Sequence, residues 1–502
     1  MATSTVEFGD FQTPPALARR VCRLLRESGL DIRSVVEPTC GIGNFLSAAM
    51  DAFPHAGGVG YEINDGYVGM AAAAVAVHGT RVVVRRADFF ELNWKSELSR
   101  LPGPILVVGN PPWVTSATLG AIGGVNLPEK SNFRRRRGIE AVTGKSNFDI
   151  SEWMLLEIAE ALSGREAAIA VLVKEAVARK VLLQWWERDC PLSDARIYSI
   201  DAPKAFGASV AACLFFSRFG DRATARECRV FGSFDDGIPP RTLGSRGGRI
   251  VADVDAFDRW RHLAGTDRFR WRSGVKHDCA GVMELKAHDG RLTNGLGETV
   301  ELEEELVFPL LKGSDIAKGR TDTPSRRMLI TQRSPADETA SIERNAPLSW
   351  RYLCRHRHLF ERRKSSIYRG RPDFAIFGIG DYTFAPYKVA VAGLAKELAF
   401  RKVPPAGKPV VLDDTVCFLP ASSEEDADLM LALLNAGPAR EFLSSQIYWE
   451  SKRPITVDVL ETLDLDALAA EIGLSREMRR VRPYGAATEP KREQRQRILF
   501  GQ

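Results

Sequence analysis

The sequence predicts an α/β protein in which a doubly wound, mostly parallel Rossmann-like sheet is followed by a second domain of mixed α+β type. Between Asp31 and about Phe219, short apolar runs of strand length alternate with helical patterns. Several of these runs are almost wholly apolar, as is typical of strands buried on both faces. After Phe219 the alternation is lost. Regular alternation indicates a parallel sheet, whereas the irregular remainder indicates a separate domain.

Each expected element follows from a local pattern. Helical patterns such as Phe45–Phe53, Tyr67–His78 and Ser151–Leu162 separate the apolar runs. Residues 232–249 are rich in Gly, Pro, Asp and Arg, which is typical of a linker. We therefore expect a first domain over residues 1–231, a linker over 232–249, a second domain over 250–475 and a basic tail over 476–502. The expected strands are Ser34–Val36, Gly57–Gly60, Val82–Arg85, Ile105–Val108, Ala168–Val173, Arg196–Ser199 and Ala211–Ser217.

Composition excludes several classes of protein. The chain has 502 residues, is 44% hydrophobic and carries a net charge of +5, which is typical of a globular protein with more than one domain. No apolar run approaches the roughly 20 residues of a membrane helix, and the N-terminus lacks the apolar core of a signal peptide. Eight dispersed cysteines with no C-x-x-C spacing predict no metal site and a reducing cytoplasm.

Acidic residues follow three successive expected strands. Glu37 precedes a glycine pair, Gly41 and Gly43, which lets the backbone approach a ligand closely at the start of a helix. Glu62 ends the second strand, where ribose hydroxyls are held in this architecture, and Asp88 follows the third. A helix N-cap is the alternative role for each acid taken singly. Three acids without a phosphate-loop lysine favour a nucleoside that carries a cation, such as S-adenosylmethionine.

The fourth expected strand ends in Gly109-Asn110-Pro111-Pro112-Trp113. The two prolines fix φ and remove two N–H donors, so the Pro111 carbonyl is held rigidly outside any helix. An amino group on an aromatic ring is a poor nucleophile, because its lone pair is delocalised into the ring. The Asn110 oxygen and the Pro111 carbonyl can bind both of its N–H groups and direct the lone pair at a methyl donor, so that catalysis is mainly positioning. A proline-rich turn is the alternative interpretation.

Taken in order, these motifs resemble the gamma class of DNA amino-methyltransferases. The resemblance covers residues 8 to about 219, and its first motif is Thr13-Pro14-Pro15. It implies S-adenosylmethionine as cofactor, with Thr13 at the cofactor carboxylate, Glu62 at the ribose, and Asp88 and Phe89 at the adenine. Beyond about residue 219 the resemblance rests on layout, with a recognition domain following the catalytic one, and on a weak likeness of Phe374–Lys388 and Lys452–Leu465 to recognition domains of such enzymes. The cofactor-binding residues that it implies are Thr13, Glu37, Pro38, Cys40, Gly41, Gly43, Glu62, Asp88, Phe89 and Asn110.

The same resemblance implies the reaction. Asn110 and Pro111, followed by Pro112, would grip the target amino group, and Trp113 would stack on a base flipped out of the duplex. Phe206 matches a second aromatic of the family, at a looser spacing. Asn at the first motif position resembles enzymes that methylate adenine N6, whereas cytosine N4 enzymes more often carry Ser. Phe148-Asp149 resembles a further cofactor-side motif, with core packing of Phe148 as the alternative.

Two basic segments are candidates for contact with double-stranded DNA. One is the run Arg134, Arg135, Arg136 and Arg137, and the other is the segment Arg351–Arg371, which has eight basic residues and one acid. Such an excess binds a polyphosphate by releasing its counterions, although a solvated face is an equal alternative for a lone charge run. Aromatic residues lie among the basic ones in the second segment. The candidate contacts there are Arg355, Arg362, Arg363 and Lys364.

Rival functions share the N-P-P-aromatic chemistry. Enzymes that methylate RNA guanines or glutamine amides in proteins use it too, but their substrate modules are usually small and precede the catalytic domain. A fused nuclease is not expected, because Glu284-Leu285-Lys286 has no convincing acidic partner upstream. We therefore expect a DNA adenine methyltransferase of restriction–modification type that acts as a monomer. A separately encoded restriction endonuclease acting on the same site is a further possible partner.

Overall fold

The computed structural model describes residues 11–114, 149–220 and 226–485. Contacts between residues divide the chain into two compact units, with the boundary between Val254 and Asp255. Each unit has its own sheets and its own buried apolar residues. No helix in the described part of the chain is long and apolar enough to cross a membrane.

The first unit is built on a ten-stranded sheet in the order β10-β9-β8-β6-β7-β5-β4-β1-β2-β3. Its β3-β2-β1-β4-β5 half is parallel throughout, and β7 is inserted antiparallel between β5 and β6. All seven strands expected from the sequence are present, which confirms the predicted Rossmann-like sheet. Their bounds are β1 (Ser34–Glu37), β2 (Gly57–Glu62), β3 (Val82–Arg86), β4 (Ile105–Gly109), β5 (Ala167–Lys174), β6 (Leu192–Ile200) and β7 (Ala212–Phe219).

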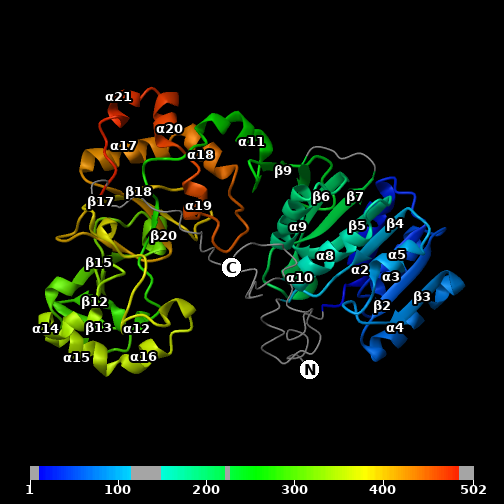
Figure 1. Ribbon diagram of the computed structural model, residues 1–502, viewed down its shortest axis with the longest axis horizontal. Helices are drawn as coiled ribbons and strands as arrows, with labels where there is room; N and C mark the ends of the chain where they lie inside the picture. Colours follow the sequence, from blue (N-terminus) through cyan, green and yellow to red (C-terminus); the bar gives the residue numbers. More distant parts are fainter. Residues whose placement is uncertain (1–10, 115–148, 221–225, 486–502) are drawn as a thin grey trace. The chain divides into compact units, whose positions relative to one another are not determined.

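Helices cover both faces of this sheet (Figure 1). Three helices that contact one another in sequence order lie on one side, and three more lie on the other. The first group is α2 (Pro15–Glu27), α3 (Asn44–Ala52) and α4 (Asp65–Val75), and the second is α5 (Trp94–Ser99), α8 (Ile150–Ala161) and α9 (Glu175–Glu187). Strands β1, β4 and β5 are buried along almost their whole length because helices cover them from both sides.

The segment expected to be a linker is part of the large sheet. After β8 (Glu227–Phe231), residues Arg241–Arg246 form β9, which pairs antiparallel with β8. The hairpin partner β10 (Arg249–Val251) follows at Gly247-Gly248, both of which have positive φ. Glycine and proline signal this hairpin turn as well as they signal a linker, and composition alone does not separate the two. The sheet therefore continues to Val251, beyond the expected domain end at residue 231.

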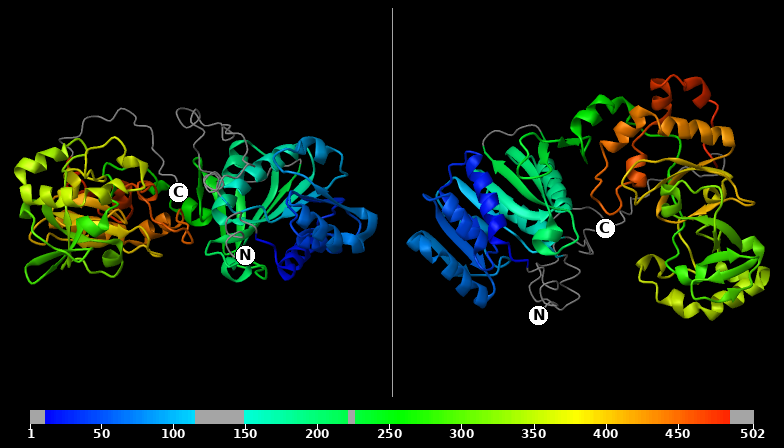
Figure 2. Two further views of the ribbon diagram at one scale, coloured as in Figure 1. Left: turned by 90° about the horizontal axis from the view of Figure 1, so that it is seen from below. Right: turned by 180° about the vertical axis from the view of Figure 1, so that it is seen from behind.

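The second unit contains two smaller sheets, which confirms its mixed α+β class (Figure 2). A four-stranded antiparallel sheet, β11-β20-β17-β18, packs with the late helices of the chain around one apolar core. A six-stranded sheet, β14-β13-β12-β16-β15-β19, packs with α14 (Ile342–Asn345), α15 (Pro347–Arg355) and α16 (Arg357–Glu361) around another. The strands of the first sheet are β11 (Arg272–Ser273), β17 (Tyr387–Ala392), β18 (Arg401–Val403) and β20 (Val416–Ala421), and the late helices are α17 (Glu424–Leu434), α18 (Gly437–Ser444), α19 (Val457–Leu460) and α20 (Leu465–Glu471). The strands of the second sheet are β12 (Glu284–His288), β13 (Arg291–Asn294), β14 (Thr299–Val300), β15 (Val307–Leu311), β16 (Arg326–Leu329) and β19 (Val411–Leu412).

Candidate active site

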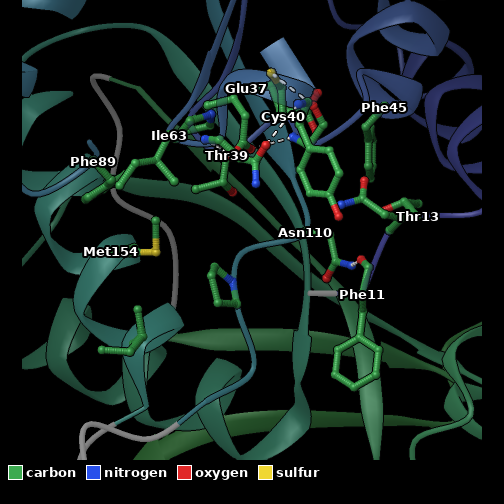
Figure 3. Close-up of a pocket in the computed structure, with 18 of the residues that line it drawn as sticks. Phe11, Thr13, Glu37, Thr39, Cys40, Phe45, Ile63, Phe89, Asn110 and Met154 are labelled. Carbon is green, nitrogen blue, oxygen red and sulfur yellow. Dashed lines mark hydrogen bonds between the residues drawn. The ribbon is translucent and has the colours of Figure 1, made fainter. Parts of the chain in front are cut away.

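A cavity of about 550 Å³ lies where the carboxyl ends of β1, β2, β3 and β4 meet. That is the edge at which open α/β sheets bind ligands, and the volume suits a nucleoside-sized molecule. Figure 3 shows Phe11, Thr13 and Asn110 on one side of the cavity and Ile63, Phe89 and Met154 on the other. The residues expected at the cofactor reach it together: Thr13, Glu37, Pro38, Cys40, Gly41, Glu62, Asp88, Phe89 and Asn110 all line it.

Gly43 is the expected cofactor residue that does not line the cavity. Its φ of 84° ends the turn after β1, and α3 begins at the next residue. A Cβ added here would lie 2.9 Å from the Ala71 backbone, so only glycine lets α4 pack this closely against the turn. Gly41, with φ of 52°, lies on the cavity wall. The glycine pair thus has two roles, since one residue shapes the ligand surface and the other the packing behind it.

The segment before α2 is fastened against this turn. Gln12 Oε1 accepts a hydrogen bond from the Ile42 N–H at 3.1 Å, and Asn44 Nδ2 donates to the Thr13 carbonyl at 2.9 Å. Thr13 itself is buried. Phe11, Gln12 and Asn44 also line the cavity, although they were not predicted from the sequence. Their positions beside the motifs could have predicted this, because Phe11 and Gln12 directly precede the Thr-Pro-Pro motif and Asn44 lies inside the glycine motif.

The three acids differ in how much of their hydrogen-bonding capacity is used. Both Glu62 oxygens accept backbone N–H groups, from Gly41 and from Asn64, each at 2.9 Å. Asp88 accepts from the Phe90 N–H at 2.9 Å. Glu37 is only 3% exposed, and its Oε2 has no hydrogen-bond partner. Burial, reinforced by the nearby Glu62 carboxylate, raises the pKa of Glu37 well above its ordinary value, and the Leu46 N–H only partly opposes this.

A hydrogen bond from the side-chain amide nitrogen fixes the orientation of the Asn110 side chain. Its Nδ2 donates to the Phe11 carbonyl at 2.8 Å, which leaves Oδ1 as a buried acceptor without a partner (Figure 3). A buried acceptor without a donor costs free energy unless a ligand satisfies it. Glu37 Oε2 is a second such acceptor on the same cavity. The site thus fits a ligand that carries cationic or N–H groups.

Three aromatic rings pack together, and one of them belongs to Phe11, whose carbonyl binds Asn110. The Trp113 ring centroid is 5.1 Å from that of Phe206 and 5.7 Å from that of Phe11. Phe206 ends the short helix α10 (Ala202–Phe206), and Phe11 and Phe206 also contact each other, at 6.1 Å. The fold therefore brings together the two aromatics singled out in the sequence. Trp113 is 6% exposed, and its Nε1 donates to the Leu172 carbonyl at 3.1 Å.

Comparison with known proteins identifies the family. No family model matches the chain. A curated relative, the Type II methyltransferase M.NspV of Nostoc sp., is 41% identical over 471 residues, which are 93% of this chain and 98% of that protein. The chain belongs to the Type II methyltransferases. The unpartnered Oε2 of Glu37 fits the family's methyl donor, S-adenosylmethionine, whose methionine amine carries charged N–H groups.

The fold of this Type II methyltransferase is also found in a much larger enzyme. The solved structure of the Type IIL restriction–modification enzyme MmeI in complex with DNA aligns with a TM-score of 0.52 at 13% identity. The alignment covers 89% of this chain and 64% of MmeI, so the methyltransferase spans a little under two thirds of that enzyme. Because the alignment includes most of this chain, the likeness in fold extends beyond the first unit.

The predicted DNA contacts divide into three groups. Arg134, Arg135, Arg136 and Arg137 lie outside the described residues, as does Phe148. Arg355, Arg362 and Lys364 are exposed on the second unit. Arg363 differs, because its guanidinium is half-buried, lies 3.6 Å from the Tyr368 ring centroid and donates to the Ala375 carbonyl at 2.7 Å. Its charge thus stabilises the loop around it, and the hypothesis of phosphate contact remains for the three exposed residues.

Proposed function

We propose that this Type II methyltransferase transfers a methyl group from S-adenosylmethionine to the N6 amino group of adenine in a short duplex DNA sequence. The observation that carries the proposal is Asn110 Oδ1, a buried acceptor without a partner on the cavity wall. Phe11 lines the same cavity, and its ring packs with those of Trp113 and Phe206. An adenine in this place has an amino group to donate and a face to stack. A base inside a duplex cannot reach such a cavity, so the proposal includes base flipping.

In this proposal the residues of the site contribute mainly by orienting the two reactants, and less by acid–base catalysis. Asn110 Oδ1 and the Pro111 carbonyl would accept the two N–H groups of the target amine, so that its lone pair faces the methyl group. Bound S-adenosylmethionine supplies that methyl group as a sulfonium electrophile. Glu37 and Glu62 would hold the donor on the opposite side of Asn110, with Asp88 and Phe89 at its adenine. Holding two reactants in line accounts for a large part of the rate gain in such reactions.

The proposal also covers the DNA contacts of the second unit, the biological system in which the enzyme acts and its cellular compartment. The exposed residues Arg355, Arg362 and Lys364 would contact DNA phosphates, and the second unit would read the target sequence. Membership of the Type II methyltransferases supports a role as the modification component of a restriction–modification system. We further propose that the enzyme acts as a monomer, since a duplex site can be methylated one strand at a time, and that a separate endonuclease acts on the same site. All eight cysteines of the sequence are free thiols, which suits a reducing cytoplasm.

The test is modification-sensitive sequencing of genomic DNA from a host that expresses the chain, compared with the Asn110→Ala variant. We expect N6-methyladenine in one short motif, and its loss in the variant. Asn110→Ala should still bind S-adenosylmethionine, since Glu37 and Glu62 are unchanged. N4-methylcytosine in place of N6-methyladenine would refute the adenine assignment. A folded, cofactor-binding protein that leaves no DNA mark would favour RNA or protein amides as the substrate, because enzymes acting on those also use the N-P-P-aromatic motif.

A further inference from the structure

The loop that carries Asn110 has few ways of being held in place. Pro111 and Pro112 have no N–H, so neither can donate a hydrogen bond to the surrounding fold. The Pro111 carbonyl must stay free if it is to accept from the target amine. The backbone of the reaction motif is therefore best fixed beyond the prolines, at Trp113, through a donor that another element supplies.

That donor is Lys174, at the end of β5. Strand β5 runs parallel to β4 with Gly109 opposite Val171, so residues just after Val171 lie beside the loop that follows Gly109. Lys174 Nζ donates to the Trp113 carbonyl at 2.8 Å. Together with the bond from Trp113 Nε1 to the Leu172 carbonyl, it attaches Trp113 to β5 through both its backbone and its side chain.

Asp149 completes the arrangement. Its Oδ2 lies 2.7 Å from Lys174 Nζ, and the two side chains are 7% and 24% exposed, respectively. Asp149 Oδ1 accepts from the Ser151 N–H and so caps α8, the helix that brings Ile150 and Met154 to the cavity. The adjacent Ile150 N–H donates to the Val114 carbonyl at 2.9 Å. A single ion pair therefore joins the end of β5, the reaction loop and the first turn of α8.

We propose that Lys174 and Asp149 are positioning residues of the methyl transfer, which hold the Asn110–Trp113 loop at the distance and angle that the reaction needs. This inference rests on the proposed function and extends it to two residues that touch neither reactant. A half-buried ion pair by itself is weak evidence for a contribution to stability. The placement of this pair, on the Trp113 carbonyl directly after the two prolines, points to geometry as its role.

The discriminating variant replaces both residues, Lys174→Met with Asp149→Asn. Asparagine keeps an acceptor for the cap of α8, and the double change leaves no unpaired buried charge, which Lys174→Met alone would do. We expect the single-turnover methylation rate on a duplex substrate to fall about 10- to 100-fold, since small displacements of reacting groups cost that much. The dissociation constant for S-adenosylmethionine and the melting temperature should stay near the wild-type values. The single variant Lys174→Arg, which keeps Asp149 and a cationic donor, should retain most of the wild-type methylation rate.

The matched control is Arg196→Met on β6. Its guanidinium is 25% exposed, close to the value for Lys174, and pairs with Asp194, which keeps a second partner in Arg229. We expect this variant to methylate at the wild-type rate. An unchanged rate in the double variant would overturn the inference. So would a parallel loss of rate, cofactor binding and melting temperature, because the pair would then be structural only. A wild-type enzyme without adenine methylation would instead refute the proposed function.

Discussion

Glu37 offers a test of how the cavity recognises a cation, and the change is Glu37→Gln. The side chain keeps its size, so the cavity should keep its shape. In the wild-type protein, burial raises the pKa of Glu37 well above 4.5, so without a ligand its carboxyl is neutral over part of the range in which an ordinary glutamate is ionised. A cationic ligand favours the carboxylate, so binding releases a proton. Wild-type affinity for S-adenosylmethionine should therefore rise with pH until it passes the pKa of Glu37.

The size of the effect follows from the unpartnered Oε2. A hydrogen bond to a charged group contributes about 1.5–3 kcal/mol, which corresponds to a dissociation constant about 10- to 150-fold higher in Glu37→Gln. The variant has no carboxyl to titrate, so its affinity should vary less with pH. The free energy of unfolding of the wild-type protein without cofactor should fall as pH rises, whereas its cofactor affinity should rise. A folded-state pKa above the unfolded one means that the wild-type free energy of unfolding falls as pH rises from about 4.5 to the pKa of Glu37. The free energy of unfolding of Glu37→Gln should not show this fall with pH, because glutamine does not titrate.

Isothermal titration calorimetry between pH 6 and pH 8, in buffers of different ionisation enthalpy, measures both the affinity and the protons released. Thermal denaturation without cofactor measures the stability. Glu97→Gln is the matched control, since Glu97 is 16% exposed, binds Arg85 and the Tyr61 hydroxyl, and does not line the cavity. If Glu37→Gln bound the cofactor within about twofold of wild type at every pH, the assignment of Glu37 to the cationic end would be refuted.

The remaining predictions concern the base and the DNA. Trp113→Leu removes the aromatic face but keeps an apolar side chain at a buried position, and it should lower the single-turnover rate more than the duplex affinity. Trp113→Phe keeps an aromatic ring and should retain more of the rate. Equal losses in rate and affinity would contradict stacking on a flipped base. Neutralising Arg362 and Lys364 together should weaken duplex binding and reduce the slope of log affinity against log salt by about 2, and an unchanged slope would mean a solvated face. Arg363→Met should instead lower the melting temperature, because it leaves a buried carbonyl without its donor, while the salt slope stays at its wild-type value.

Much of the first unit could be predicted from the sequence because the patterns that specify it are local. A strand buried on both faces must be apolar, so the strands of the large sheet stand out between amphipathic helices. Successive parallel strands place their carboxyl ends at one edge, and so Glu37, Glu62, Asp88 and Asn110 could be assigned to one cavity from the sequence alone. The hairpin of β9 and β10 was missed because its glycines signal a hairpin turn and a linker equally well.

By itself, the sequence determined the class of the fold, the order of the motifs and the residue types available at the cavity. Only the tertiary structure decided how those residues are used, since hydrogen-bond partners come from elements far apart in the chain. It left Asn110 Oδ1 free by tying the Asn110 amide to Phe11, and it separated Arg363 from its exposed neighbours by burying it against a loop. It also placed Lys174 on the Trp113 carbonyl through the register of β4 and β5, a pairing that no local pattern contains.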